Sequence, residues 1–142
     1  MSHFESVVDI ERPVDIVYAW FLAMDENAPR IDPEADEGRK EPPGETGPGT
    51  TFYLKSGSRE SPVTYTNLEP NQWIDFITKI GPMRPTARLS FEPTNSGTRL
   101  SIRAQPNLPT LLKPLEPLAN RMGKREWDGR LDRIRADLEE SG

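Results

Sequence analysis

The chain has 142 residues, a formal net charge of −5, one His and no Cys, and this length suits a single domain over residues 1–142. The lack of Cys excludes disulfides, thiolate nucleophiles and cysteine-type zinc sites, and a lone histidine, His3, excludes metal sites built on several histidines. The acidic balance argues against nucleic-acid binding, and no apolar run approaches the roughly 20 residues that span a bilayer, so we expect no membrane insertion and a cytoplasmic location.

The first elements along the chain are a strand and two helical segments. Small or apolar residues alternate with mostly polar ones over residues 3–11, which predicts a half-buried strand. Pro13 suits a first helical turn, and the apolar run 14–24 predicts a helix that is covered on more than one side. Residues 25–33 predict a short second helical turn or loop, and residues 34–41 a weak edge strand.

The middle of the chain predicts an antiparallel meander with one apolar face. Turn sequences stand at residues 57–58, 70–71, 82–83 and 95–97. A one-residue slip would place Asp75, Arg88 or Arg103 on the apolar face, so the pattern specifies the register. The predicted rows of that face are Phe52, Tyr65, Phe76, Leu89 and Ile102; Leu54, Val63, Thr78, Ala87 and Ala104; and Thr50, Asn67, Ile74, Phe91 and Leu100.

A long helix is predicted at the end of the chain, and it is the best candidate to cover the apolar face. The segment up to Glu140 has no proline after Pro117, and its apolar residues form two offset stripes that meet at Gly123. A glycine there marks a bend, a close approach of another element or a tolerated helix flank. The stripes are Leu111, Leu115, Leu118 and Met122, and then Trp127, Leu131, Ile134 and Leu138.

This order of elements resembles the helix-grip fold of the START and birch-pollen-allergen-like superfamily (SRPBCC), in its polyketide cyclase/dehydrase-like branch. The likeness is carried by residues 4–15 (FESVVDIERPVD), 21–33 (FLAMDENAPRIDP) and the closing helix 118–139. One departure is Ile31, which stands before Asp32-Pro33 where many relatives have Trp. The resemblance implies an α+β fold in which a curved antiparallel sheet wraps around the C-terminal helix, with two short helices after the first strand.

The resemblance also implies a cavity between the sheet and the long helix that holds a small hydrophobic molecule in many members. Binding or transport of such a ligand is therefore the leading hypothesis, by a monomer or homodimer that carries no cofactor and no metal. The acidic stretch 32–38 lacks the ligand positions of a calcium loop, and Gly44, Gly47 and Gly49 lack the order of a phosphate loop. The predicted ligand-binding residues are Phe52, Leu54, Val63, Tyr65, Asn67, Ile74, Phe76, Thr78, Leu89, Phe91, Leu100, Ile102 and Met122.

An alternative hypothesis is a cyclase or aromatase that catalyses an aldol-type cyclisation or dehydration. Tyr65, with Asn67 and Thr78 on adjacent rows, is the candidate hydrogen-bond donor to a developing enolate, and the competing interpretation is a core tyrosine bonded to backbone or water. A cyclase also needs a proton acceptor, for which Asp32 and Glu126 are the candidates. Whether the chain is an enzyme stays open at this point.

A third hypothesis is a regulator of the same fold that offers its outer sheet or its acidic loop to another protein. Acidic residues dominate the segment 25–45, and four arginines are predicted to project from the outer face of the last hairpin. Solvent-facing arginines in salt bridges are the simpler explanation of such a surface. The arginines are Arg84, Arg88, Arg99 and Arg103.

Overall fold

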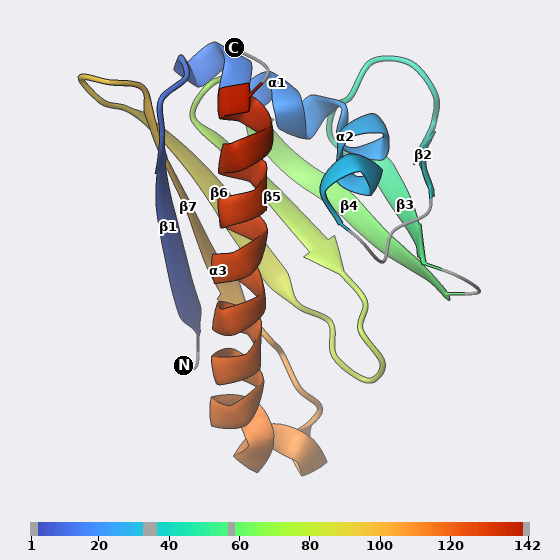
Figure 1. Cartoon of the computed structure of the whole chain (residues 1–142). Helices are drawn as coiled ribbons and strands as arrows, with labels where there is room; N and C mark the ends of the chain where they lie inside the picture. Colours follow the sequence, from blue (N-terminus) through green and yellow to red (C-terminus); the bar gives the residue numbers. More distant parts are fainter. Residues whose placement is uncertain (1–2, 33–36, 57–58, 141–142) are drawn as a thin grey trace.

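The computed structural model describes residues 3–32, 37–56 and 59–140. In these residues a seven-stranded antiparallel sheet has the order β1-β7-β6-β5-β4-β3-β2. Its concave side holds three helices, of which the longest runs along the β1 half of the sheet (Figure 1). The elements are β1 (Phe4–Ile10), α1 (Val14–Leu22), α2 (Met24–Ile31), β2 (Glu37–Glu41), β3 (Thr51–Ser56), β4 (Arg59–Glu69), β5 (Trp73–Thr78), β6 (Thr86–Pro93), β7 (Thr98–Gln105), the 3₁₀ helix η1 (Thr110–Leu115) and α3 (Glu116–Glu140). The predicted helix-grip fold is confirmed.

The segment before the meander follows its sequence pattern closely. In β1 the side chains of Ser6, Val8 and Ile10 are buried, and those between them are exposed. α1 begins directly after Pro13, and it buries residues on more than one side, as an apolar run requires. α2 is a full helix rather than a turn, because it continues through Pro29 to its end.

Gly38 of β2 explains how α2 is held against the sheet. Pro29 has no N–H, so it leaves the carbonyl of Asp25, four residues earlier, without its helical donor. Gly38 packs on this part of α2, and a Cβ atom at position 38 would lie 2.5 Å from the Asp25 carbonyl oxygen. Only a residue without a side chain allows this contact between α2 and the edge strand.

The strand register agrees with the prediction at some ladders and differs by two residues at others. Leu89 lies opposite Ile102, as predicted. Phe52, however, lies opposite Val63 rather than Tyr65, because Ser56 pairs with Arg59. Phe76 lies opposite Ala87, because Ile80 pairs with Met83 and the two-residue turn is therefore Gly81-Pro82 rather than Pro82-Met83. A two-residue shift leaves every side chain on its predicted face.

A β-bulge in β4 makes one predicted position wrong. Tyr65 pairs with Phe76, but the register then shifts, so that Asn67 lies opposite Asp75 and Leu68 opposite Ile74. The extra residue leaves both Thr66 and Asn67 exposed between two inward residues. Asn67 therefore lies on the convex face, and its predicted place among the ligand-binding residues of the concave row is not retained.

The two predicted stripes of α3 have different surroundings. Leu131, Ile134 and Leu138 are buried against the sheet, whereas Met122 is 63% exposed. Gly123 is a point of close approach, because a Cβ atom there would lie 2.6 Å from the ring of Phe4. The Phe4 side chain of β1 thus packs directly on the backbone of the long helix.

Asp137 ties the three helices of the concave side together. Its carboxylate accepts hydrogen bonds from the Trp20 indole (2.9 Å) and from the Arg30 guanidinium (2.5 Å). Burial raises the pKa of Asp137, but the bonds from Arg30 and Trp20 outweigh it and hold that pKa below its ordinary value.

We expect Asp137→Asn to lower the free energy of unfolding by about 1 kcal/mol at neutral pH, because the charged acceptor is lost. A carboxyl group with a lowered pKa in the folded state stabilises above its unfolded pKa, and it loses this contribution as the pH falls through the folded pKa. The difference between variant and wild type should therefore shrink below about pH 4. Urea unfolding across this pH range measures it, with the exposed Asp132→Asn as control; an unchanged difference at low pH would contradict the assignment.

Candidate functional site

The concave face of the sheet has a packed part under the helices. Eight of the predicted ligand-binding residues lie in it, and all are buried. The rings of Phe21 and Phe91 make an edge-to-face contact there, with centroids 5.6 Å apart. Because helices and sheet fill this region with each other's side chains, these residues form a core. The eight are Phe52, Tyr65, Ile74, Phe76, Leu89, Phe91, Leu100 and Ile102.

A second part of the concave face is only half-buried. Leu54 of β3, Val63 of β4, Thr78 of β5 and Ala87 of β6 each keep an intermediate exposure. In Figure 1, β3 and β5 end, and β4 and β6 begin, at the lower side of the sheet. Trp127 of α3 is also half-buried, and its ring centroid lies 6.1 Å from that of Phe76. We call these five residues, Leu54, Val63, Thr78, Ala87 and Trp127, the lower concave surface.

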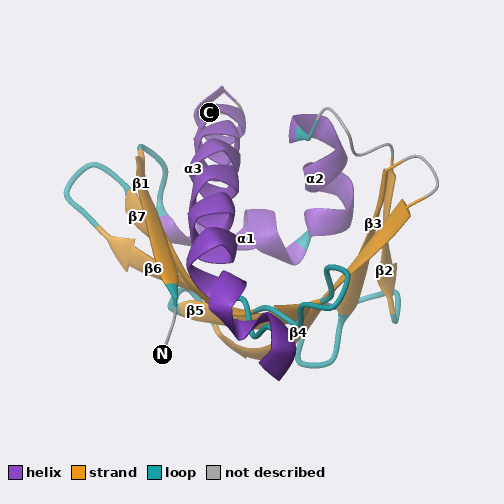
Figure 2. Ribbon diagram, turned by 90° about the horizontal axis from the view of Figure 1, so that it is seen from below, coloured by secondary structure: helices purple, strands orange, loops and turns teal. Residues whose placement is uncertain are grey.

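The lower concave surface keeps part of its apolar side chains exposed to solvent. Seen from below, α2 and α3 stand apart above the curved sheet, with β4 and β5 between them (Figure 2). α2 contacts β2 and β3, and α1 contacts β6; Phe52 of β3 and Phe91 of β6 are buried. Solvent-accessible apolar side chains on a concave surface are what a small apolar ligand requires.

Few polar groups border the lower concave surface. The hydroxyl of Thr78 donates to the carbonyl of Pro62 at 2.7 Å. The guanidinium of Arg130 lies over the Trp127 ring, 4.7 Å from its centroid, and donates to Glu126 at 2.9 Å. One edge of the surface thus carries an ion pair stacked on an aromatic ring, Thr78 adds a hydroxyl that is already bonded, and Leu54, Val63 and Ala87 are apolar.

Tyr65 is used by the fold rather than presented to this surface. Its side chain is fully buried, and its hydroxyl donates to the carbonyl of Phe21 at 2.7 Å. Burial, and to a smaller degree the nearby Tyr18 and Asp25, raise the pKa of the phenol. The phenol is therefore a neutral donor whose proton is already committed to the backbone of α1.

The other predicted catalytic groups do not gather around Tyr65. Asn67 is on the convex face, and the Thr78 hydroxyl is bonded to a backbone carbonyl. Glu126 is exposed and paired with Arg130, and Asp32 is half-buried directly after α2. Within the ranges that the structure describes, no group of three His, Asp or Glu side chains could hold a metal ion.

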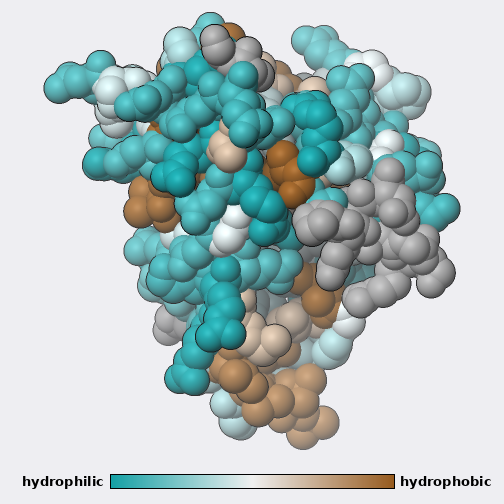
Figure 3. Space-filling view, in the orientation of Figure 1, coloured by the Kyte–Doolittle hydropathy of each residue, from teal (hydrophilic) through white to brown (hydrophobic). Residues whose placement is uncertain are grey.

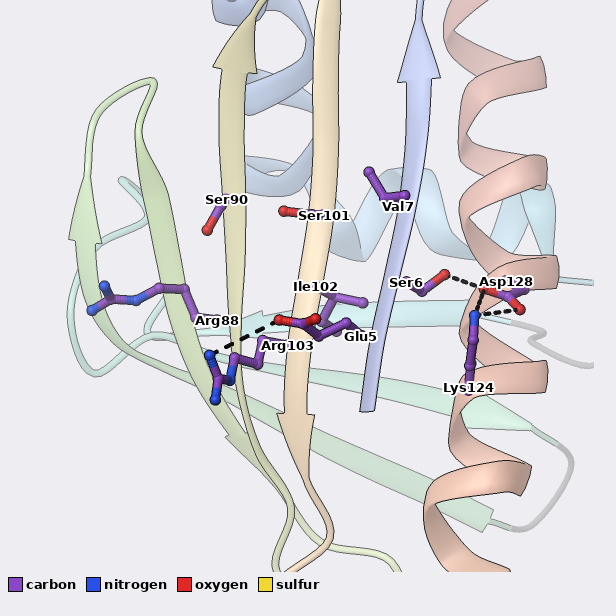
Figure 4. Close-up of a pocket in the computed structure, with 10 residues that line it drawn as sticks. All are labelled: Glu5, Ser6, Val7, Arg88, Ser90, Ser101, Ile102, Arg103, Lys124 and Asp128. Atoms are coloured by element: carbon purple, nitrogen blue, oxygen red, sulfur yellow. Dashed lines mark hydrogen bonds and ion pairs between the residues drawn. The ribbon is translucent and has the colours of Figure 1, made fainter. Parts of the chain in front are cut away.

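A shallow cavity of about 580 Å³ lies elsewhere, beside β1 (Figure 4). Its charges are already paired: Arg88 donates to Asp75 at 2.6 and 2.9 Å, and Lys124 to Asp128 at 3.2 Å. The Ser6 hydroxyl also donates to the Asp128 carboxylate. This hydrogen bond and the charge of Lys124 hold the pKa of Asp128 below its ordinary value. These pairs fasten strands and helix, so this cavity is a poorer candidate site. It is lined by Glu5, Ser6, Val7, Arg88, Ser90, Ser101, Ile102, Arg103, Lys124 and Asp128.

Two residues of the lower concave surface, Ala87 and Trp127, are missing from the predicted ligand-binding set. Ala87 belongs to the predicted row of Val63 and Thr78, so the strand pattern contains the signal for it. Trp127 starts the stripe of α3 that faces the sheet, whereas the predicted helix contributor, Met122, belongs to the exposed stripe. The sequence alone does not show which of the two apolar stripes of α3 faces the sheet, because that depends on where β1 contacts the helix.

Comparison with solved structures shows the same fold at low sequence identity. A START superfamily protein from Mycobacterium smegmatis matches with a TM-score of 0.77 at 10% identity, over 100% of each chain. Ara h 8.0201 matches with a TM-score of 0.77 at 14% identity, over 96% of each chain. The di-domain ARO/CYC StfQ from the steffimycin biosynthetic pathway matches with a TM-score of 0.77 at 18% identity, over 99% of this chain and 51% of that one.

No curated protein matches the sequence closely. None of the helices in the described part of the chain combines the length and the apolar character needed to cross a bilayer. A family model for polyketide cyclase / dehydrase and lipid transport matches residues 1–139. The chain therefore belongs to the polyketide cyclase / dehydrase and lipid transport family.

Proposed function

We propose that this protein binds a small apolar ligand on the lower concave surface, without transforming it. The observation that carries the proposal is the contrast in burial along single strands. On β4, Tyr65 is fully buried while Val63, two residues away on the same face, is half-buried. A ligand that covers Val63 and its neighbours gains the free energy of removing apolar surface from water, about 25 cal/mol for each Å².

The lining suggests the form of the ligand. Trp127 offers aromatic surface, and Leu54 and Val63 offer aliphatic surface across the sheet. The Arg130–Glu126 pair supplies both donors and acceptors at one edge. These groups fit an apolar molecule that carries one polar end near Arg130. We propose that the protein binds this molecule in the cytoplasm, as a monomer or homodimer.

Val63→Glu is expected to weaken binding of such a ligand at least about tenfold, because the carboxylate must then lose water against an apolar molecule. The measurement is titration with the fluorescent apolar probe anilinonaphthalene sulfonate, together with native mass spectrometry of the purified protein to identify any compound that is released on denaturation.

The matched control is Ile77→Glu, on the neighbouring strand β5 but on the convex face, where Ile77 is exposed. The control should bind like wild type, and thermal unfolding checks that both variants are folded. Equal binding by wild type and Val63→Glu would rule out the lower concave surface as the site.

A second candidate is a cyclase or aromatase, which the family match and the likeness to StfQ favour. Such an enzyme needs a proton acceptor beside the ligand. Glu126 and Asp128, on either side of Trp127, are the carboxylates nearest in sequence to the surface, but both are exposed, and Glu126 is paired with Arg130 and Asp128 with Lys124. Conversion of a linear poly-β-ketone into a cyclised product, followed by mass spectrometry, would support this candidate over simple binding.

A further inference from the structure

The start of the long helix carries an exposed apolar stripe that the proposed ligand site does not use. We define the tip stripe as Leu111, Leu115, Leu118 and Met122, which are 92%, 51%, 50% and 63% exposed. In Figure 3 the lower end of the molecule, where η1 and the start of α3 lie, is brown. Four large apolar side chains grouped at one end are more than the scattered exposed leucines of an ordinary surface.

The tip stripe points away from the sheet. Trp127 and Gly123 face β5 and β1 through their contacts with Phe76 and Phe4. Leu118 and Met122 precede Trp127 by nine and five residues, which at 3.6 residues per turn places them on the opposite side of the helix. The exposure of Leu118 and Met122 is therefore not explained by an empty ligand site, because these side chains do not face the concave side of the sheet.

Basic residues surround the tip stripe in an otherwise acidic protein. Residues 110–125 contain Lys113, Arg121, Lys124 and Arg125 but one acidic residue, Glu116, while the whole chain carries −5. Arg121 and Arg125 follow Leu118 and Met122 by three residues each, so they lie beside the stripe. Both are exposed, and within residues 3–32, 37–56 and 59–140 neither forms an ion pair.

We propose that the tip stripe docks this protein reversibly on an anionic membrane surface. Leucine and methionine side chains enter the boundary between head groups and acyl chains, and neighbouring arginines attract the anionic lipids. A second copy of this chain fits the tip less well, because a twofold contact centred on it would bring Arg121 and Arg125 against their own equivalents. Figure 1 shows η1 and the start of α3 at the lower end of the molecule, the end at which β5 finishes and β6 begins.

The experiment is flotation with vesicles of phosphatidylcholine alone and of phosphatidylcholine with phosphatidylserine. We expect binding to the second kind, falling as salt is raised because exposed charges are screened. Arg125→Glu should weaken it about tenfold or more, whereas Arg133→Glu, further along α3 and also exposed, should change it little. The paired change Leu111→Gln and Met122→Gln should abolish binding, and Val7→Gln with Ile77→Gln on the convex face should leave it intact.

No binding to either vesicle would overturn the proposal, as would equal binding by the tip variants and wild type. Sedimentation of the protein without vesicles tests whether a second copy of the chain covers the tip stripe instead. If wild type is a dimer and the Leu111→Gln and Met122→Gln variant is a monomer, the stripe is a contact between copies, and membrane docking is overturned. The inference does not rest on the ligand site, because Val63→Glu should still bind vesicles. The two proposals can therefore fail separately.

Discussion

Replacing Gly97 with alanine is expected to lower the free energy of unfolding by about 3 kcal/mol, because the new methyl group has no room. Gly97 closes the β6–β7 hairpin, and its backbone packs directly on the connection between β1 and α1. A Cβ atom there would overlap the carbonyl oxygen of Ile10 and lie 2.8 Å from the backbone nitrogen of Arg12. Both are backbone atoms, so neither can rotate away as a flexible side chain would. Urea unfolding followed by circular dichroism measures the change.

Gly47→Ala is the matched control for this prediction. No heavy atom would lie within 4 Å of a Cβ atom at position 47, so we expect a change within about 0.5 kcal/mol. If both variants were equally stable, the hairpin would have to shift away from the β1–α1 connection without cost. That result would contradict the tight packing seen at Gly97.

Tyr65→Phe is expected to lower the free energy of unfolding by about 2 kcal/mol, because it leaves the buried carbonyl of Phe21 without its donor. The hydroxyl is the only atom removed, and the ring contact with Phe52, at a centroid distance of 5.0 Å, is kept. Binding of an apolar probe should be unchanged, since Tyr65 is fully buried. Chemical unfolding and probe titration of the same preparation give both quantities.

Tyr53→Phe serves as the control, since Tyr53 is a half-buried tyrosine on β3 that stacks under Arg39. We expect it to change stability by less than about 0.5 kcal/mol. The catalytic hypothesis makes the reverse prediction for Tyr65. A Tyr65→Phe variant of normal stability that no longer cyclises a poly-β-ketone would assign the phenol to chemistry and remove its structural role.

The apolar face of the meander was predictable, but the partner of each residue was predictable only in part. Side chains alternate with a period of two, so any even shift keeps the same face inward and leaves no trace in the pattern. Phe52 therefore pairs with Val63 and not with Tyr65, without any polar residue entering the core. An odd shift does leave a trace, and the bulge after Tyr65 is one: Leu68 takes the inward place that a regular strand would give to Asn67.

The candidate site depended on information that no strand pattern contains. Phe76 and Thr78 look alike as inward residues of β5, yet the first is 6% exposed and the second keeps intermediate exposure. The difference arises from packing, because Phe76 belongs to the buried core cluster and contacts Trp127 of α3, whereas Thr78 does not belong to that cluster. It also decides between the stripes of α3, because the contact of Gly123 with Phe4 turns Trp127 inward and Met122 outward.

The division of the concave face has a consequence for how this protein can change. Each of four strands provides one residue that holds the fold and, two positions away on the same face, one that meets solvent. Substitutions at buried positions cost several kcal/mol, whereas partly exposed positions tolerate change at a small cost. Ligand preference can therefore diverge among descendants of this sequence, or be redesigned, while the scaffold stays intact. The pairs of anchor and variable positions are Phe52 with Leu54, Tyr65 with Val63, Phe76 with Thr78, and Leu89 with Ala87.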